Sequence, residues 1–306
     1  MSRESLRTSL AIEAGGSTGK AALYHEGAIS VRVIRSGLNP VDVGYSVFEE
    51  RVRTLVIPLL DRLGAGGVRI YACAAVAGAG DPGVAAACRR ILGGVIKSRS
   101  TRPRVRVLSD LDAMTEYFLS EHDGIVLIAG TGSVCAGAKH RRGRVMKARV
   151  GGRGGYLDRG SGFRMGLDVL GVALGAYDGT EAVNGTVRLL CERYGIELKD
   201  VPRRFLPPER DRIAGLARIA LEAYTAGDPF ARSLVREAAR DLMEMVLAVK
   251  TKTGLGTRFR VVVSGGMFRD PALARLFRGR IRRTLPHAEL HHVTDSLIPL
   301  LKLTRN

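Results

Sequence analysis

The sequence predicts an α/β protein built from two related domains, with a ligand-binding cleft where their strands end. Short apolar strands alternate with helical segments along the 306 residues, a pattern typical of α/β folds. An apolar strand, a glycine turn and a more polar strand follow one another near residue 9 and again near residue 124. Because open α/β sheets bind ligands at the ends of their strands, we expect the functional site at these turns.

The first third of the chain is predicted to contain three strands, then a helix, then two strand–helix pairs. The predicted strands are Ser9–Glu13, Ala21–Tyr24, Ala28–Ile34, Val68–Val76 and Val105–Leu108, and the predicted helices are Tyr45–Leu63, Val84–Leu92 and Asp110–Ser120. Apolar residues at helical spacing indicate the helices, and short apolar runs between turn residues indicate the strands.

The rest of the chain repeats the strand–turn–strand pattern and continues as mostly helical sequence to Met245. The predicted elements are strands at Gly124–Gly130, Ser133–Ala138 and Phe259–Val263, a glycine cluster at Gly151–Gly155, and a helix at Ser161–Ala176. The second part therefore starts like the first, which supports two related domains.

The composition limits the classes of function. Lys and Arg exceed Asp and Glu by 48 to 30, a net charge of +18, which favours anionic ligands. The basic residues are spread along the chain, aromatics are 5%, and no helix-turn-helix or zinc-finger spacing occurs, so we expect no specific nucleic-acid partner. No apolar run is long enough for a membrane span, the start is polar, and the four cysteines are far apart. We expect a cytoplasmic protein with no membrane partner and no disulfide framework.

The first chemical motif is the glycine turn Glu13–Thr18 between the first two strands. Gly15 and Gly16 allow the backbone to approach a phosphate, and the hydroxyls of Ser17 and Thr18 can donate hydrogen bonds. The Glu13 carboxylate could hold a hydrated Mg²⁺. An ordinary hairpin turn is the alternative interpretation.

Two further glycine turns each follow an apolar strand. In the first, Gly130 and Gly132 flank Thr131 and expose its amide and hydroxyl, as a phosphate-binding turn requires. In the second, Ser264–Met267, the small residues Gly265 and Gly266 would let a ribose or adenine lie close to the backbone. Each turn alone could be purely structural, but three of them across two α/β halves favour a nucleotide site.

Three aspartates complete the candidate site. Asp110 and Asp112 lie where a strand passes into a helix, so each could be a helix cap or a catalytic base. Asp158, between the glycine cluster and the next helix, has a similar ambiguity. The GxGxxG pattern at Gly78–Gly83 lacks an acid at the spacing of a dinucleotide site. The histidines His287, His291 and His292 are expected to be surface residues.

The order of these motifs resembles the sugar-kinase/actin/Hsp70 ATPase superfamily. Within it, the chain looks like the branch of the N-acetylglucosamine kinases and the BadF/BadG/BcrA/BcrD ATPases, with its strongest likeness to archaeal ATP-dependent hexokinases. The segments that carry the likeness are Ile128–Val134, Arg149–Gly154 and Gly265–Arg269. The resemblance implies two ribonuclease H-like (actin-like ATPase) domains with an interdomain cleft: residues 1–120 with the tail 293–306, and residues 121–292.

The resemblance also implies roles for single residues. The phosphates of ATP would bind Gly15, Gly16, Ser17, Thr18, Gly130, Thr131 and Gly132, and the adenosine would bind Ser264, Gly265, Gly266 and Met267. The sugar would bind Asn39, Ala77, Gly78, Asp110, Thr131, Gly152, Arg153 and Asp158, and Mg²⁺ would be held through water by Glu13 and Asp158. Asp110 matches the catalytic base because it stands 20 residues before Gly130, a spacing that Asp112 does not fit.

The function implied by the resemblance is ATP-dependent phosphorylation of a hexose or amino sugar (glucose, glucosamine or N-acetylglucosamine) at its 6-hydroxyl, by a homodimer. An activator ATPase with an iron–sulfur cluster is the alternative, but such proteins use paired cysteines, and Cys73 and Cys88 are 15 residues apart. The sequence departs from the family pattern at Arg159, Gly162 and Phe163.

Overall fold

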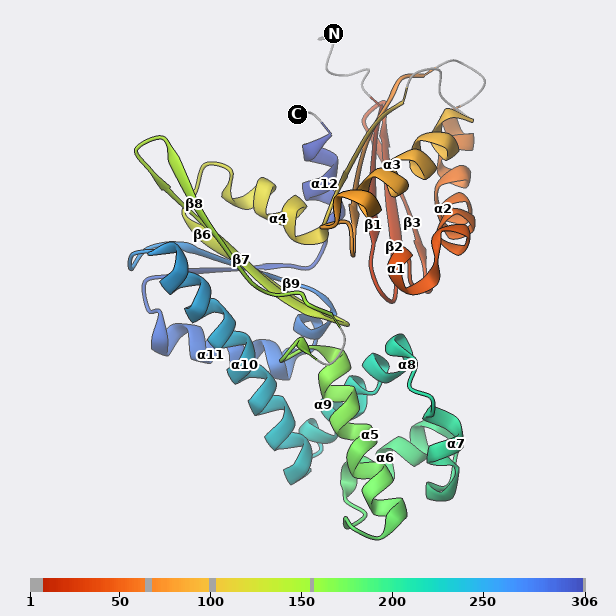
Figure 1. Cartoon of the computed structure of the whole chain (residues 1–306), viewed down its shortest axis with the longest axis vertical. Coiled ribbons are helices and arrows are strands. Elements are labelled where there is room, and N and C mark those ends of the chain that lie inside the picture. Colours follow the sequence, from red (N-terminus) through yellow and green to blue (C-terminus); the bar gives the residue numbers. More distant parts are fainter. Residues whose placement is uncertain (1–7, 64–67, 99–102, 155–156, 305–306) are drawn as a thin grey trace. The chain divides into compact units, whose positions relative to one another are not determined.

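The computed structural model describes residues 8–63, 68–98, 103–154 and 157–304. The chain divides into two compact units, the first formed by residues 1–120 with 295–306 and the second by residues 121–294 (Figure 1). Each unit is an α/β structure around one five-stranded sheet, which confirms the predicted fold class.

The sheet of the first unit has the strand order β3-β2-β1-β4-β5. Its strands are β1 (Thr8–Ala14), β2 (Gly19–His25), β3 (Ala28–Ile34), β4 (Ile70–Val76) and β5 (Arg104–Leu108), and its helices are α1 (Pro40–Val43), α2 (Tyr45–Leu60), α3 (Pro82–Lys97), α4 (Asp110–Leu119) and α12 (Leu297–Leu303). β1, β4 and β5 are parallel, whereas β2 is antiparallel to both of its neighbours. The carboxyl ends of β1, β4 and β5 therefore lie at one edge of the sheet.

The two faces of this sheet are packed differently. Large apolar side chains fill the space under α2 and α3, among them the fully buried Phe48 and Leu92. The opposite face carries small residues such as Ala11 and Ala75, on which α4 and α12 pack. Small residues let a helix approach closely, so the last helix of the chain completes the first unit.

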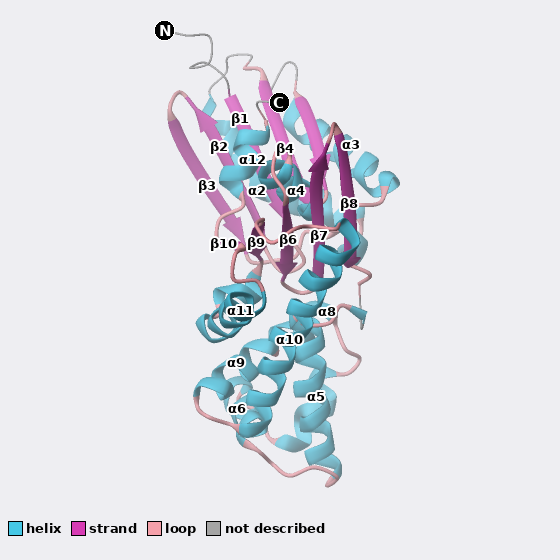
Figure 2. Ribbon diagram, turned by 90° about the vertical axis from the view of Figure 1, so that its left-hand side faces the viewer, coloured by secondary structure: helices cyan, strands magenta, loops and turns pink. Residues whose placement is uncertain are grey.

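The sheet of the second unit has the order β10-β9-β6-β7-β8 (Figure 2). Its strands are β6 (Gly124–Ala129), β7 (Ser133–Arg141), β8 (Arg144–Gly151), β9 (Arg260–Ser264) and β10 (Glu289–Val293), and its helices are α5 (Gly162–Asp178), α6 (Gly185–Tyr194), α7 (Val201–Phe205), α8 (Arg210–Gly215), α9 (Ala217–Thr225), α10 (Pro229–Thr253) and α11 (Pro271–Thr284). The long helix α10 packs on β6, β7 and β8, and α11 packs on α10.

The two sheets have the same topology. Each starts with three consecutive antiparallel strands, and the first strand of each then pairs with a parallel strand from later in the chain. This bears out the two related halves that the repeated strand–turn–strand pattern predicts. The analysis of the sequence did not predict β8, β10 or α12.

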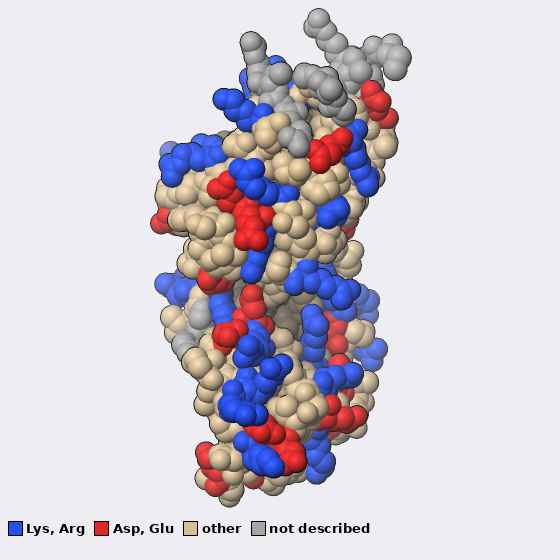
Figure 3. All heavy atoms as spheres, turned by 90° about the vertical axis from the view of Figure 1, so that its right-hand side faces the viewer, with Lys and Arg blue, Asp and Glu red and all other residues tan. Residues whose placement is uncertain are grey.

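Charges of both signs lie on the face of the molecule that Figure 3 shows, where Lys and Arg side chains are interspersed with Asp and Glu. Among the described residues, no helix combines the length and apolar character needed to cross a bilayer.

Candidate functional site

In the first unit, the turn between β1 and β2 is a tight hairpin connection. The amide of Gly15 donates to the carbonyl of Thr18 (3.1 Å), and the carbonyl of Gly15 accepts from the amide of Leu38 (2.8 Å). The predicted phosphate turn and the loop before α1 are therefore joined by a hydrogen bond. The turn is a hairpin, and it could still bind a phosphate, because Ser17 at its tip is exposed and its hydroxyl can reach a ligand.

Glu13, near the end of β1, has partners that the sequence did not reveal. Its Oε2 atom accepts a hydrogen bond from Lys20 Nζ at 2.7 Å, because Lys20 is its neighbour on β2. The hydroxyl of Ser296, just before α12, donates to the same oxygen. The carboxylate is thus fixed by a cation and a hydroxyl at the carboxyl edge of the sheet, with 27% of its side chain exposed.

The predicted sugar-binding residues of the first unit also meet at this edge. A Cβ atom placed on Gly78 would lie 3.0 Å from Asn39 Oδ1, and the amide of Ala77 donates to the carbonyl of Ala14 (2.9 Å). Asn39 is buried and is the N-cap of α1, with its amide nitrogen donating to Asp42 Oδ2 at 2.7 Å. Asn39 therefore has a structural role in the local fold, and any contact with a sugar would be additional.

The structure separates the roles of the two aspartates that follow β5. The N-cap of α4 is Ser109, whose hydroxyl oxygen accepts from the amide of Asp112 (3.0 Å) and donates to its carboxylate (2.6 Å). Asp112 is thus part of the helix start and is exposed. Asp110 is the first helical residue and is half-buried, and its Oδ1 accepts from the amide of Leu111 (2.8 Å). The interpretation of Asp110 as the cap is wrong.

In the second unit, the turns predicted for phosphate and adenosine are neighbours. A Cβ atom on Gly130 would lie 3.8 Å from the amide nitrogen of Gly266. Gly265 has φ of +105°, and a Cβ there would lie 2.2 Å from the carbonyl oxygen of Ala129, so only glycine fits. The first amides of α5 hold the phosphate turn, since Gly162 donates to the carbonyl of Gly130 at 2.8 Å.

Asp158 is almost completely buried against the same turn. Its two carboxylate oxygens accept from the amides of Arg153 (2.9 Å) and Gly154 (3.2 Å), and so fix the start of the glycine cluster. Gly155, at the end of that cluster, lies outside the described residues. A Cβ atom on Gly132 would lie 2.7 Å from Asp158 Oδ2. Asp158 is not a helix cap, because Ser161 caps α5.

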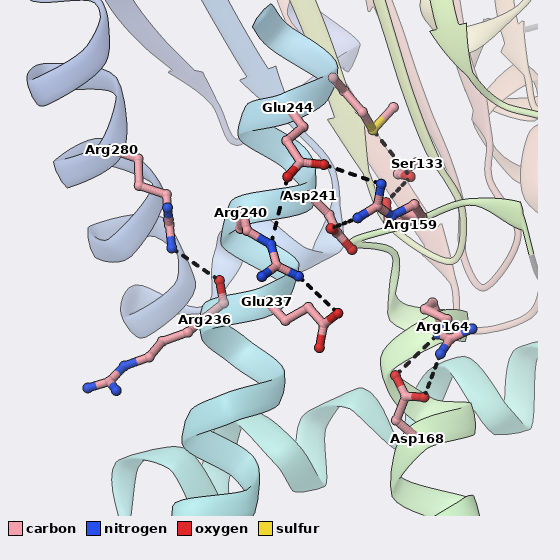
Figure 4. A network of polar contacts seen from close by, with 11 residues as sticks. Ser133, Arg159, Arg164, Asp168, Arg236, Glu237, Arg240, Asp241, Glu244 and Arg280 are labelled. Atoms are coloured by element: carbon pink, nitrogen blue, oxygen red, sulfur yellow. Dashed lines mark hydrogen bonds and ion pairs between the residues drawn. The ribbon is translucent and has the colours of Figure 1, made fainter. Parts of the chain in front are cut away.

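Arg159 connects this segment to α10 (Figure 4). Its guanidinium pairs with Asp241 at 2.5 Å and with Glu244 at 3.2 Å, and its carbonyl accepts from Ser133 Oγ at 2.6 Å. Burial raises the pKa of Asp241, and the charge of Arg159 partly opposes that rise. The arginine thus places a positive charge next to a buried carboxylate of α10.

A cavity of about 200 Å³ lies beside this network. It is lined by Arg159, Arg164 and Asp168, together with residues of α10. Arg164 and Asp168 form an ion pair at 3.1 Å, and burial raises the pKa of Asp168. The cavity thus lies between the first turns of α5 and the middle of α10.

The carboxylates present fit a Mg²⁺ ion that is held mainly by water and phosphate oxygens. Glu13 in the first unit and Asp158 in the second are fixed, half-buried or buried carboxylates beside a glycine turn. Mg²⁺ bound with nucleotide usually keeps several waters and uses one or two carboxylates. Among the described residues, no three His, Cys, Asp or Glu side chains gather closely enough to hold a metal directly. The histidines His287, His291 and His292 are exposed.

The structure thus assembles the predicted residues into two sets, one in each unit. The first set lies at the carboxyl edge of β1, β4 and β5, and the second lies at the corresponding edge of β6 and β9. Sequence reasoning missed Lys20, Ser296 and the α8 residue Arg210, whose Nη2 would lie 3.5 Å from a Cβ on Gly132. None of the three stands in a recognisable motif.

Comparison with solved structures agrees with this architecture. A protein of Chromobacterium violaceum that is provisionally named an N-acetylglucosamine kinase superposes with a TM-score of 0.74 at 18% identity, over 98% of this chain and 99% of its own. The chain therefore has the two-domain α/β fold of the actin-like ATPases.

Comparison of sequences defines the family. The profile of the BadF/BadG/BcrA/BcrD ATPase family matches residues 10–295, and the chain belongs to this family. An N-acetylmuramic acid/N-acetylglucosamine kinase of Clostridium acetobutylicum is 28% identical over 236 residues, which cover 74% of each chain. An N-acetyl-D-glucosamine kinase of Dictyostelium discoideum is 29% identical over 179 residues, 56% of this chain and 55% of its own. The stronger likeness to archaeal hexokinases gains no support from these relatives.

Proposed function

We propose that the chain is an ATP-dependent sugar kinase that transfers the γ-phosphoryl group to the 6-hydroxyl of a hexose or amino sugar. Membership of an ATPase family supports the use of ATP. The names of both sequence relatives favour N-acetylglucosamine over glucose and glucosamine as the acceptor.

The observation that carries the proposal is the placement of one glycine turn at the same sheet edge in each of two similarly built units. Gly15–Thr18 follows β1 and Gly130–Gly132 follows β6, and both strands pair with a parallel strand at that edge. The phosphates of ATP bind the amides and hydroxyls of these turns, and the adenosine lies on Ser264–Met267. Backbone amides then offset the charge that spreads over the transferring phosphoryl group.

Asp110 acts as the base for the sugar hydroxyl. It lies at the end of β5, at the same sheet edge as Asn39 and Gly78, which bind the sugar. An ordinary carboxylate suffices because the hydroxyl becomes acidic only as its bond to phosphorus forms, and Asp110 then accepts the proton. In the second unit, we assign Gly152, Arg153 and Asp158 to sugar binding.

Glu13 and Asp158 hold Mg²⁺ through water. The ion supplies positive charge to the β- and γ-phosphates. The hydrogen bond from Lys20 to Glu13 orients the carboxylate, so that it can bind the waters of the ion.

The test is a coupled ADP-release assay over a panel of hexoses and amino sugars, with Asp110→Asn and the matched control Asp112→Asn. Both substitutions remove one charge at the start of α4. Asp110→Asn should still bind ATP and sugar but lose about 10²–10⁴-fold in kcat. Asp112→Asn should stay within a few-fold of the wild type, because its carboxylate only accepts a hydrogen bond from Ser109, the N-cap of α4. Equal activity of the two variants contradicts the assignment of the base.

The activator ATPase remains the second candidate because it belongs to the same family. Burial raises the pKa of Cys73 and of Cys88 to about 11, and Cys135 is fully buried. An iron–sulfur cluster needs accessible thiolates, so these cysteines favour the kinase. A brown protein with absorption near 400 nm would favour the activator instead. The homodimer and the cytoplasmic location stay predictions, which a sedimentation measurement and cell fractionation would test.

A further inference from the structure

A positive charge lies beside the turn Gly130–Gly132. A Cβ atom placed on Gly132 would lie 3.5 Å from Nη2 of Arg210 and 2.7 Å from Oδ2 of Asp158. A guanidinium and a carboxylate thus lie next to the same backbone position. Because Gly132 carries no side chain, the backbone of the turn can come this close to both groups.

The arginine is held in place by tight helix packing. Arg210 begins α8, and α8 packs against α5 so closely that a Cβ on Gly166 would lie 1.8 Å from the carbonyl oxygen of Ile213. Ile213 is fully buried. The adjacent turn of α5 binds the carbonyls of Gly130 and Thr131. The turn, α5 and α8 therefore form one packed assembly, and Arg210 is half-buried in it.

The electrostatics of the turn call for a cation. Asp158 is buried, and its two oxygens accept hydrogen bonds from backbone amides, so its carboxylate is fixed next to the turn. A triphosphate next to a carboxylate needs positive charge beside it, from Mg²⁺ or from a basic side chain. An arginine stays charged at any working pH and presents two donors to phosphate oxygens. Arg210 is placed to supply that charge.

We infer that Arg210 binds the γ-phosphoryl group at the Gly130–Gly132 turn and is a second catalytic residue besides Asp110. The inference rests on the proposed kinase function. As the phosphoryl group separates from ADP, negative charge spreads over the phosphoryl oxygens. The positive charge of Arg210 stabilises these oxygens more in that transition state than in bound ATP. The inference assigns a role to a residue of the helical segment between β8 and β9, outside the glycine motifs.

The experiment compares Arg210→Gln and Arg210→Lys with Arg212→Gln. Arg212 is the matched control: it stands two residues further on the same helix, is exposed, pairs with Glu209 at 3.4 Å and donates to the carbonyl of Arg204. kcat and KM are measured for ATP and for the sugar, and affinities for ADP and for a non-hydrolysable ATP analogue are measured by calorimetry.

Arg210→Gln should lower kcat about 10²–10³-fold, weaken the ATP analogue more than ADP, and leave the KM for sugar within about threefold. Arg210→Lys should recover only part of the loss, because an ammonium lacks the two-donor geometry. In Arg210→Ala, added guanidinium ion at millimolar concentration should restore some activity, which a purely structural role would not allow. Arg212→Gln should behave as the wild type.

The inference is overturned by an Arg210→Gln variant with kcat within fivefold of the wild type, by equal weakening of ADP and the ATP analogue, or by equal effects at Arg210 and Arg212. If Arg210→Gln does not fold, Arg210→Lys decides by the same criteria. A wild-type protein that phosphorylates no sugar refutes the proposed kinase instead. The comparison of ADP with the ATP analogue still tests Arg210 in that case.

Discussion

The pair of Arg159 and Asp241 gives a prediction that can be worked out from the structure. Arg159→Gln removes the cation that faces a carboxylate whose side chain is only 7% exposed. The other charges near Asp241 are Glu237 and Glu244 on its own helix, which act to raise its pKa, and the Arg164–Asp168 pair of α5 across the cavity. Both glutamates also pair with Arg240. Without Arg159, the buried carboxylate loses the cation that pairs with it directly.

The direction with pH follows from the raised pKa. Burial already holds the pKa of Asp241 above its ordinary value, and Arg159 limits the rise. A carboxyl group whose pKa is raised in the folded state lowers the free energy of unfolding as pH increases. The loss starts near the unfolded pKa, about 3.9, and is complete above the folded pKa. Arg159→Gln raises the folded pKa further. The variant should therefore lose more stability at pH 8 than at pH 5.

The expected size is about 1–3 kcal/mol at pH 8. The lower part of that range applies because 58% of the Arg159 side chain is exposed and solvent screens the pair. Arg193→Gln is the matched control, since Arg193 is 59% exposed but its partner Glu222 is 44% exposed. That variant should change stability by less than about 0.5 kcal/mol.

The assay is urea unfolding at pH 5 and pH 8. The proteins are Arg159→Gln, Asp241→Asn, the double variant Arg159→Gln/Asp241→Asn and the control Arg193→Gln. Asp241→Asn removes the buried charge, so the double variant should recover much of the loss at pH 8. The reasoning is refuted if Arg159→Gln loses the same stability at both pH values, or if the effects of the two substitutions simply add.

Two further stability predictions follow from single positions. Gly265→Ala should lower the yield of folded protein, because its Cβ would meet the carbonyl of Ala129 at 2.2 Å, whereas Gly266→Ala, with no atom within 4 Å, should melt like the wild type. Asp228→Ala should cost about 1–3 kcal/mol in urea unfolding at pH 7, because the carboxylate caps α10 and accepts from Thr186 Oγ at 2.8 Å. Burial acts to raise the pKa of Asp228, but its hydrogen bonds lower it overall. The stability it contributes is therefore present above pH 4 and lost as pH falls through the folded pKa, so equal costs at pH 7 and pH 2 would contradict this account.

The sequence predicted those parts of the fold that depend on local pattern. The strands β1 and β6 are apolar runs that end at glycine turns, so their place and their turns could be inferred. β8 and β10 could not, because their side chains are mostly polar or exposed and the sheet position, not the pattern, makes them strands. α12 packs on a face of small residues from β1, β2 and β4. Because β1 lies nearly 300 residues before α12 in the sequence, no local pattern indicates this contact.

The candidate site shows the same division. The local pattern identified the glycine turns and left Asp110 and Asp112 both open as caps or bases, and only the family resemblance favoured Asp110 as the base. Only the structure assigns the cap to Ser109 and binds Asp112 to it. Lys20 and Arg210 carry no motif. Lys20 meets Glu13 because it is its neighbour on β2, and Arg210 approaches the turn at Gly132 from 78 residues further along the chain. Sequence spacing alone cannot indicate such contacts.

The departures from the family pattern have local physical explanations that leave the phosphate turns intact. At Gly162 a Cβ would lie 3.1 Å from the carbonyl oxygen of Gly130 and 3.3 Å from the sulfur of Met267, so glycine relieves crowding where α5 meets both turns. Phe163 is buried in the core. Arg159 follows Asp158 in the chain and pairs with Asp241, so this segment is tied to α10. All three residues therefore contribute to the packing of the second unit around the Gly130–Gly132 turn and the segment that follows β8.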